Sequence, residues 1–331
     1  MANLNGPPEL SALRCWVISE GHAGAENQCL GLTETLGCQA EVKRIKVAPP
    51  WKWLPAQCWM RPLDGWGFGG DQLVPPWPDL AISCARKPGG IAAALRKASG
   101  GKTFVVHIQD PRLSPESFDL IAVPEHDRLR GENVIVTRGS LHRVTPARLS
   151  AAAERFAPLL AHLPRPLVAV LIGGANRHFR YTGTRIQALT TQLAACAKAY
   201  GAGLALTPSR RTEAQHLALL RAGLAGTPSY IWDGQSENPY YGLLALADVI
   251  AVTSDSISML SEACATGKPV YVIEIAAGSP RWERFQQGLY ADGIARPFDG
   301  KLARWIYPPL KETERVAAAI RERLTSRFQT I

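Results

Sequence analysis

The chain has 331 residues, which is long for one compact domain and sufficient for two. Hydrophobic residues make up 46% and charged residues 20%, so the composition excludes a largely disordered protein. The apolar runs, such as residues 167–172, are far shorter than the roughly 18 residues of a membrane-spanning helix, and we expect none. The 37 Lys and Arg against 28 Asp and Glu give a net charge of +9, which favours an anionic partner. Because no block of five or six basic residues occurs, we expect no nucleic-acid partner.

The start of the chain and its cysteines both favour a cytosolic compartment. The first ten residues, MANLNGPPEL, lack a basic region followed by an apolar core, and we expect no secretory signal. The seven cysteines are odd in number and scattered, without a Cys-x-x-Cys pair, which is typical of buried free thiols. We therefore expect a cytoplasmic protein without a metal centre.

Short apolar runs alternate with longer helical patterns along the first half. Strands are expected at residues 13–18, 40–47, 79–84, 103–108, 118–124 and 133–137. Helices are expected at about 26–36, 90–98 and 146–162. The first helix should end at Gly37, where a C-cap glycine belongs. Residues 49–78 hold five tryptophans and repeated prolines, and we expect irregular structure there.

The proline-containing segment 162–166 separates two halves of similar pattern. After it, strands are expected at residues 167–172, 202–207, 228–232, 248–252 and 269–274, with helices between them and a final helix at about 310–327. Nearly continuous apolar strands alternating with helices indicate parallel sheets covered on both faces. The predicted fold class is therefore α/β, with two doubly wound Rossmann-like domains facing a cleft, over residues 1–163 and 164–331. The terminal helix is placed in the second domain.

The loops that follow strands are the candidate sites, because ligands of such sheets bind beyond the carboxyl ends of the strands. The loop at 20–28 follows the first strand, and its Gly21 and Gly24 allow a sharp turn and a close approach to a ligand. The start of the next helix favours an anion there, although the spacing matches neither the dinucleotide fingerprint nor a P-loop. His22 in this loop can transfer a proton near neutral pH, or it is a surface turn histidine.

Two loops of the second half combine small, hydroxyl and arginine residues. The loop after residues 167–172 contains Gly173, Gly174, Asn176 and Arg177. The loop after residues 202–207 contains Ser209, Arg210 and Arg211. Glycine amides beside arginines suit the oxygens of a diphosphate. A plain glycine turn and a solvated helix start are the alternatives.

The most specific pattern lies between residues 247 and 273. A strand there leads into a polar turn that contains Ser254, Asp255, Ser256 and Ser258. Hydroxyls and free amides at the start of the following helix would hold phosphate oxygens, or the serines are ordinary N-caps. Glu262 follows in a semi-apolar stretch, where a carboxylate needs a role, and it can accept hydrogen bonds from sugar hydroxyls.

This segment resembles the donor-binding element of GT-B glycosyltransferases, in particular the lipid-linked N-acetylglucosaminyltransferase of peptidoglycan synthesis. An Ala-Asp strand, a serine-containing turn, a helical Ser-Glu and a Gly-x-Pro occur there in the same order. The resemblance implies that Glu262 binds the ribose of a nucleotide and that residues 254–258 bind its phosphates. Gly173 and Gly174 match the glycine loop of the second domain of that fold, and residues 21–24 match the first-domain loop less fully.

Across nearly the whole chain, the sequence is similar to the plant elongated-mitochondria fission-factor family and its bacterial relatives. The matching motifs are Gly-x-x-Gly-x-x-Asn-Gln at 21–28, Gln-Asp-Pro-Arg at 109–112, Pro-Glu-His-Asp at 124–127, Gly-Gly at 173–174, Ser-Arg-Arg-Thr at 209–212, Asn238-Pro-Tyr, and Thr-x-Asp-Ser-x-Ser-Met-x-Ser-Glu at 253–262. Asn238 therefore joins the residues expected to bind a donor. The resemblance implies recruitment of a fission dynamin for plant members and a glycosyltransferase for bacterial ones.

We expect an inverting, metal-independent glycosyltransferase that uses a nucleotide-sugar donor and no other cofactor. The base that deprotonates the acceptor is sought among loop residues of the first half, with His22 ranked first, Asp127 second, and Asp110 and His126 after them. The acceptor would be a lipid-linked or envelope glycan. Two alternatives stay open, namely a non-catalytic scaffold of the fission family and a nucleotide-sugar 2-epimerase.

The tryptophan-rich stretch suggests where such a protein would meet a membrane. Between Lys43 and Arg61, tryptophan, leucine and methionine are mixed with basic residues. This mixture suits an anionic bilayer interface, and we expect a peripheral location on the inner face of a membrane. The alternative is a loop that packs its tryptophans into the first domain.

Overall fold

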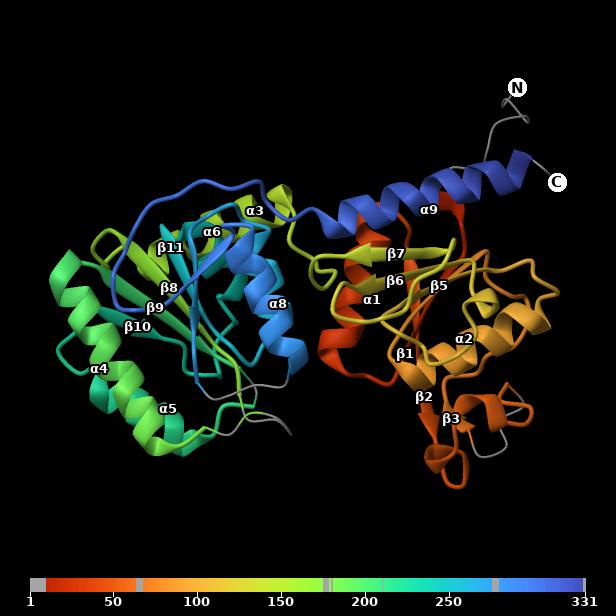
Figure 1. Ribbon diagram of the computed structural model, residues 1–331, viewed down its shortest axis with the longest axis horizontal. Coiled ribbons are helices and arrows are strands. Elements are labelled where there is room, and N and C mark those ends of the chain that lie inside the picture. The colour runs from red at the N-terminus through yellow and green to blue at the C-terminus, as the bar shows by residue number, and fades with distance from the viewer. Residues whose placement is uncertain are drawn as a thin grey trace. The chain divides into compact units, whose positions relative to one another are not determined.

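The computed structural model describes residues 10–63, 68–174, 179, 181–209, 211–275 and 280–329 (Figure 1). The contacts divide the chain into two compact units. Unit 1 is the chain up to Arg143 together with the segment from Lys311 onward, and unit 2 is Val144–Leu310. Each unit is built around one sheet.

These units differ from the predicted domains at both ends of the second one. Helix α3 (Pro146–Leu160) packs against α6 (Tyr240–Leu246) and so belongs to unit 2, although we expected it in the first domain. Helix α9 (Glu312–Gln329) packs against α1 (Ala23–Leu36) and belongs to unit 1, although we expected it in the second domain. The burial of apolar side chains accounts for both differences. Helix α3 packs its apolar residues into the core of unit 2, and α9 packs its apolar residues into the core of unit 1. The proline-containing segment at 162–166 is a loop within unit 2.

Unit 1 contains a seven-stranded sheet in the order β3-β2-β1-β4-β5-β6-β7. Its strands are β1 (Cys15–Ser19), β2 (Ala40–Val47), β3 (Phe68–Gly70), β4 (Leu80–Cys84), β5 (Phe104–Ile108), β6 (Leu120–Pro124) and β7 (Val134–Thr137). All neighbours pair in parallel except β2 and β3, which are antiparallel. The chain leaves β1 toward β2 on one side and returns to β4 on the other, so the topological switch point lies between β1 and β4.

Alternate residues of these strands point to opposite faces of the sheet, and both faces are covered. Val17 packs in one cluster with residues of α1 and α9. Trp16 and Ile18 pack in the other with α2 (Arg86–Ala98) and with Trp51 of the tryptophan-rich segment. Unit 1 is therefore doubly wound, as its apolar strands predict.

Unit 2 contains a six-stranded parallel sheet in the order β10-β9-β8-β11-β12-β13. Its strands are β8 (Leu167–Ile172), β9 (Gly203–Pro208), β10 (Ser229–Ile231), β11 (Val249–Thr253), β12 (Val270–Ile273) and β13 (Ala295–Pro297). Its further helices are α4 (Gly183–Tyr200), α5 (Ala214–Gly223), α7 (Ile257–Cys264) and α8 (Pro280–Ala291). Helices α4 and α5 contribute to the core on one face, and α3, α6, α7 and α8 to the core on the other. The switch point of this sheet lies between β8 and β11.

Most expected elements are confirmed to within a few residues. Helix α1 ends at Gly37, which has the left-handed φ of 79° that a C-cap glycine supplies. Strands β3 and β13 were not predicted, and each is a three-residue edge strand too short to show an alternating pattern. In the part of the chain that the structure describes, no helix combines the length and apolarity needed to cross a membrane.

Candidate functional site

The candidate site of unit 2 lies at the switch point of its sheet. The loop that begins at Gly173 leaves β8, and the turn that begins at Ser254 leaves β11. Because β8 and β11 are neighbours in the sheet, the two most specific patterns of the sequence meet at one place. Sheets of this type bind ligands beyond the carboxyl ends of the strands at such a switch point, and we refer to this region of unit 2 as the crevice.

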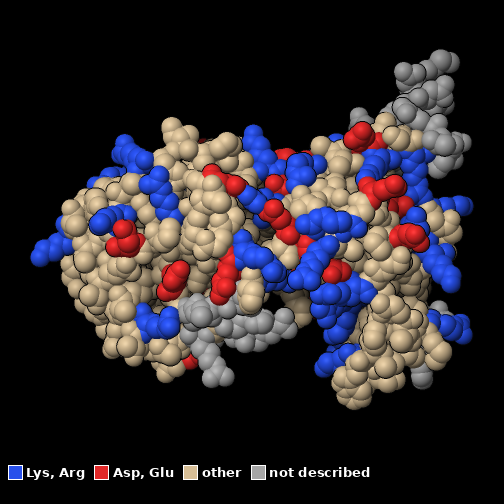
Figure 2. All heavy atoms as spheres, in the orientation of Figure 1, with Lys and Arg blue, Asp and Glu red and all other residues tan. Residues whose placement is uncertain are grey.

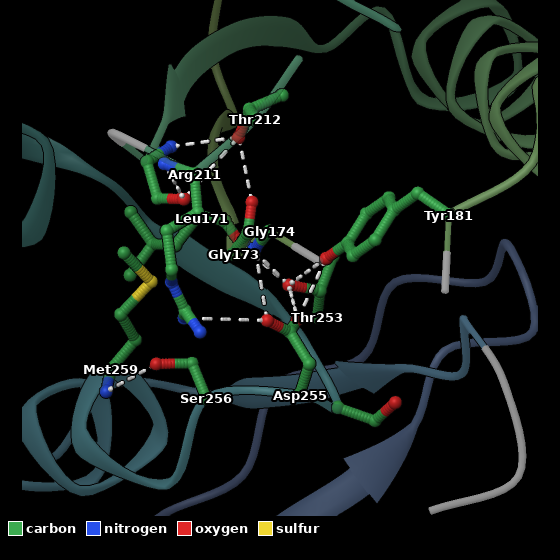
Figure 3. A network of polar contacts seen from close by, with 12 residues as sticks. Leu171, Gly173, Gly174, Tyr181, Arg211, Thr212, Thr253, Asp255, Ser256 and Met259 are labelled. Carbon is green, nitrogen blue, oxygen red and sulfur yellow. Dashed lines mark hydrogen bonds and ion pairs between the residues drawn. The ribbon is translucent and has the colours of Figure 1, made fainter. Parts of the chain in front are cut away.

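A buried carboxylate holds this crevice together (Figure 3). Asp255 is 3% exposed, and its two side-chain oxygens accept three hydrogen bonds. The donors are the Gly174 amide at 2.9 Å, the Tyr181 hydroxyl at 2.7 Å and the Thr253 hydroxyl at 2.7 Å. Thr253 Oγ1 in turn accepts from the Gly173 amide at 2.8 Å. Asp255 was predicted to bind the donor, and in the structure its carboxylate binds groups of the protein at the ends of β8 and β11.

The two glycines are required because no side chain fits beside this network. A Cβ at Gly173 would lie 2.0 Å from Asp255 Oδ2, and a Cβ at Gly174 would lie 2.5 Å from the Arg211 backbone. Burial next to the Asp255 charge raises the pKa of the Tyr181 hydroxyl above its ordinary value, so Tyr181 stays a hydrogen-bond donor. The backbone of Gly173 and Gly174 is thereby fixed in one conformation at the end of β8.

The loop after β9 is tied to the same glycines. Thr212 Oγ1 donates to the Gly173 carbonyl at 2.7 Å, and Ser209 Oγ accepts from the Arg211 amide at 3.2 Å. The Arg211 guanidinium lies 3.7 Å from Asp255 Oδ2, and its side chain is 49% exposed. Arg211 is thus a cation at the mouth of the crevice, with its backbone against Gly174 (Figure 3).

The serines of the turn divide between the interior and the helix start. Ser254 is buried, and its Oγ accepts from the Ile275 amide while its carbonyl accepts from Gln286 of α8 at 3.0 Å. Ser256 Oγ accepts from the Met259 amide at 3.3 Å and caps α7. Ser258 is half-buried in the first turn of α7. N-capping, the alternative reading of the serines, is therefore observed at Ser256.

Glu262 lies on α7 and is 9% exposed. The Tyr240 hydroxyl of α6 donates to its Oε2, and Asn238 Oδ1 accepts from the Tyr240 amide at 3.0 Å at the start of that helix. Burial raises the pKa of Glu262 to about 7, against the lowering effect of the hydrogen bond from Tyr240. Among the described residues, no second hydrogen bond to the Glu262 carboxyl group is present. The sequence motif contained Tyr240, but only the packing of α6 against the sheet revealed it as the partner of Glu262.

Three residues predicted to bind the donor lie outside the described residues. They are Asn176, Arg177 and Arg210.

The candidate site of unit 1 begins at the end of β1. Gly21 has the positive φ of 80°, and its amide donates to Ser19 Oγ at 2.9 Å. His22 is exposed, and its backbone carbonyl accepts from the first amides of α1. Gly24 lies in the first turn of α1, where a Cβ would meet nothing within 4 Å. The structure therefore gives Gly21, but not Gly24, a backbone role.

The sequence reasoning missed a cation beside this loop. Lys87 in the first turn of α2 forms an ion pair with Glu20 at 2.9 Å, and this pair joins the loops after β1 and β4. These are the two strands of the switch point in unit 1. The position of Lys87 three residues after the strand at 80–84 was the available signal.

The other candidate bases are spread along the sheet. Asp110 follows β5 and pairs with Arg112 at 3.1 Å. His126 and Asp127 follow β6 and are half-buried. Strand β6 is separated from β1 by β4 and β5, so the strand ends that Asp127 and His22 follow are about 14 Å apart, at ~4.8 Å per strand. The four candidates thus follow three different strands, β1, β5 and β6.

The described residues contain no group of three or more His, Cys, Asp or Glu that would hold a metal ion. Three polar groups of unit 2 remain as candidates to bind a ligand. They are the amides at the start of α7, the Arg211 guanidinium, and the Glu262 carboxyl group.

Comparison with known proteins places nearly the full length of the chain in one family. The sequence profile described as Mitochondrial fission ELM1 matches residues 23–324. The mitochondrial fission protein ELM1 of Arabidopsis thaliana is 30% identical, over 95% of this chain and 92% of its own length.

Solved structures share the fold at low sequence identity. The UDP-GlcNAc 2-epimerase of Methanocaldococcus jannaschii superposes with a TM-score of 0.53 at 11% identity, over 94% of this chain and 100% of its own. The glycotransferase of kitacinnamycin superposes with a TM-score of 0.51 at 15% identity, over 95% of this chain and 93% of its own. The chain belongs to the Mitochondrial fission ELM1 family and has the two-sheet α/β fold of GT-B glycosyltransferases and related epimerases.

Proposed function

We propose that the protein is an inverting, metal-independent glycosyltransferase that takes its sugar from a nucleotide-sugar donor. The observation that carries this proposal is the crevice beside β8 and β11, where the exposed Arg211 follows β9, and the start of α7 and the buried Glu262 follow β11, the other neighbour of β8. Such a set provides hydrogen-bond donors for a diphosphate and an acceptor for sugar hydroxyls.

Each group has a role in the proposed binding of the donor. The diphosphate would bind to the start of α7, at Ser256 and Ser258, and to the Arg211 guanidinium. The helix start carries a partial positive charge, and the guanidinium carries a full one. The second oxygen of Glu262 would accept hydrogen bonds from the ribose hydroxyls. Asp255 and Ser254 would act indirectly, because their side chains hold the loops in place.

The proposed reaction is a single displacement. A base removes the proton of the acceptor hydroxyl as its oxygen bonds to the anomeric carbon, and the bond from that carbon to the diphosphate oxygen breaks. The nucleoside diphosphate leaves with the electron pair, stabilised by Arg211 and the α7 amides. His22 is the proposed base, since it is exposed at the switch point of unit 1 and an imidazole nitrogen can accept the proton of a hydroxyl.

The test is a thermal-shift screen of nucleotides and nucleotide sugars on the wild type, Glu262→Ala and a matched control, Glu322→Ala. Glu322 is an exposed glutamate on α9 in unit 1. We expect one nucleotide family to raise the melting temperature of the wild type and the control, and to raise that of Glu262→Ala much less. If no nucleotide stabilises the wild type, the donor site does not exist.

A second candidate is a binding protein that retains the fold without chemistry. The Arabidopsis relative, a mitochondrial fission protein, favours it, because that protein is 30% identical over nearly the full length of both chains. The fold of the Methanocaldococcus jannaschii protein, a UDP-GlcNAc 2-epimerase, keeps epimerisation as a third candidate. Incubation with the stabilising nucleotide sugar separates the three. Release of nucleoside diphosphate with transfer to an acceptor supports transfer, a 2-epimer supports epimerisation, and an unchanged nucleotide sugar supports binding alone.

A further inference from the structure

A groove on unit 1 lies between α2 and the tryptophan-rich segment, here residues 51–63. Its lining residues are distant in sequence from those of the crevice of unit 2. We infer that this groove receives an acyl chain of an anionic membrane lipid, while the exposed apolar residues of the segment enter the same bilayer. The inference does not depend on the proposed transferase, because it concerns other residues and another ligand.

The segment is a built structure rather than a loose loop. Trp51 is 4% exposed and packs in the core of unit 1, which fixes one end of the segment. The Trp59 indole donates to the Trp51 carbonyl at 3.0 Å and to the Leu54 carbonyl at 3.2 Å, so the chain between them is closed into a compact turn. A Cβ at Gly90 of α2 would lie 2.9 Å from the Trp59 ring, and the glycine therefore allows the ring to lie on the helix.

This packing leaves large apolar side chains in solvent. Trp53 is 75% exposed, Met60 is 64% exposed and Leu54 is 42% exposed. Three large apolar residues within one short segment are unusual for a surface in water, and such a patch marks an interaction site. Packing of the tryptophans into the first domain, the alternative to a membrane contact, is therefore observed for Trp51 and not for Trp53.

The groove beside these residues has a volume of about 600 Å³. Its apolar lining comes from Trp59 and Leu63 of the segment, from Ala94 of α2 and from Leu113. This volume is in the range of small-molecule sites, ~300–1,000 Å³, and the lining suits a hydrocarbon chain. No hydrogen-bonding group is needed for such a ligand, whose attraction comes from the apolar surface removed from water.

The charge around the groove selects the occupant. Arg61 and Lys97 lie among its lining residues. The sequence from Val42 to Leu63 contains five Lys and Arg and no Asp or Glu, and so does the sequence from Leu80 to Gln109. Four of these ten cations, Lys43, Arg44, Lys87 and Arg96, pair with carboxylates outside the two ranges. Figure 2 shows the corresponding lobe, where Figure 1 labels β3, as mostly uncharged with Lys and Arg at its margins. Cations beside exposed tryptophan match an anionic lipid interface, at which each Lys or Arg is attracted to the acidic headgroups.

The test is vesicle flotation of the full chain. We expect binding to vesicles of phosphatidylcholine and phosphatidylglycerol in equal parts, and binding about tenfold weaker or more to pure phosphatidylcholine. Raised salt should weaken the first interaction. Failure to float with the anionic vesicles, or equal binding to the neutral ones, would overturn the inference.

Exposed side chains make the variants informative, since their replacement leaves the core intact. The triple variant Trp53→Ser, Leu54→Ser, Met60→Ser should bind anionic vesicles at least about tenfold more weakly. The matched control is Ile306→Ser, because Ile306 of unit 2 is 97% exposed and lies outside the segment. The control should bind as the wild type does, and equal weakening in both would show that general surface hydrophobicity is responsible.

The groove itself is tested by filling it. Ala94→Phe places a ring in the groove without changing charge, and it should weaken binding while Trp53, Leu54 and Met60 stay in place. Unchanged affinity in this variant would remove the groove from the inference. Cys58 is exposed while the other six cysteines are buried, so an environment-sensitive dye at Cys58 should report an apolar surrounding when anionic vesicles are added. An unchanged signal despite flotation would show that another surface of the protein binds, which contradicts the inference.

Discussion

The Tyr240 hydroxyl donates a hydrogen bond to the Glu262 carboxyl group, and this contact joins α6 to α7 beside the crevice of unit 2. Glu262 is 9% exposed, and its burial raises its pKa to about 7. Burial next to Glu262 likewise raises the pKa of Tyr240 above its ordinary value, so the tyrosine remains a donor. The pKa of Glu262 is therefore close to neutral pH. Its second carboxyl oxygen has no hydrogen-bond partner among the described residues.

The first prediction concerns the stability of unit 2 against pH. Glu262 has a pKa near 4.5 in the unfolded chain and about 7 in the native protein, so the native state binds more protons between these values. The free energy of unfolding should therefore fall by about 3 kcal/mol as the pH rises from 4.5 through 7, and this group should contribute no further change above about pH 8. Urea titrations at several pH values on the wild type and Glu262→Gln measure it, because the variant lacks this dependence.

Glu322→Gln is the matched control for that comparison, since Glu322 is exposed on α9. Its pH dependence should follow the wild type. If the free energy of unfolding depends on pH in the same way for the wild type and Glu262→Gln, the pKa of Glu262 is not raised in the native protein.

The fold was predictable where burial is uniform and local. The strands β1, β4, β5, β8 and β11 are buried along their whole length and nearly continuously apolar because both faces of each sheet are covered, and this pattern needs no knowledge of the rest of the chain. The membership of α3 and α9 was not predictable, because an amphipathic helix shows which of its own faces is buried and not which sheet covers it.

The second prediction concerns the buried carboxylate at the switch point. Asp255→Asn replaces one acceptor oxygen by an NH₂ group, which then faces either the Gly174 amide or the Tyr181 and Thr253 hydroxyls. At least one buried donor then loses its acceptor, and we expect the free energy of unfolding to fall by about 2–4 kcal/mol. Tyr181→Phe removes one hydrogen bond and keeps the carboxylate, so its loss should be about 1 kcal/mol. Urea unfolding gives both values, and equal losses would contradict the central role of Asp255.

The third prediction separates two glycines that looked alike in the sequence. Gly173→Ala should lower the free energy of unfolding by about 1–3 kcal/mol and abolish any nucleotide-induced thermal shift, because the added Cβ meets Asp255. Gly24→Ala should raise stability by about 0.5–1 kcal/mol, because Gly24 lies inside α1 with open space around it. Thermal unfolding with and without nucleotide measures both. A destabilised Gly24→Ala would show that this helix start is strained.

The site was predictable as a set of loops and not as a set of roles. The position of Gly173 and of Ser254–Ser258 after strands identified the crevice, because the ends of adjacent parallel strands meet. The roles depend on contacts over long sequence separations, such as Tyr181 with Asp255 and Tyr240 with Glu262, which no local pattern encodes. For the same reason Asp255 was predicted as a ligand contact, whereas its partners are backbone and hydroxyl groups of the loops.

The last prediction concerns a buried histidine in unit 1, whose effect on stability has the opposite sign to that of Glu262. His107 is fully buried in β5, where its Nδ1 lies 2.8 Å from Ser83 Oγ and its ring contacts Gly89. Burial lowers the pKa of His107 to about 3, so the unfolded chain binds more protons than the native protein between pH 3 and 6.5. The free energy of unfolding should fall by about 1.4 kcal/mol for each unit of pH below 6.5 from this group alone.

His107→Gln should lower stability at neutral pH and flatten this slope, whereas His162→Gln, at an exposed histidine, should leave the slope unchanged. Urea titrations between pH 4 and 7 report the slopes. A slope in His107→Gln as steep as that of the wild type would mean that His107 is not the group that makes unit 1 sensitive to acid.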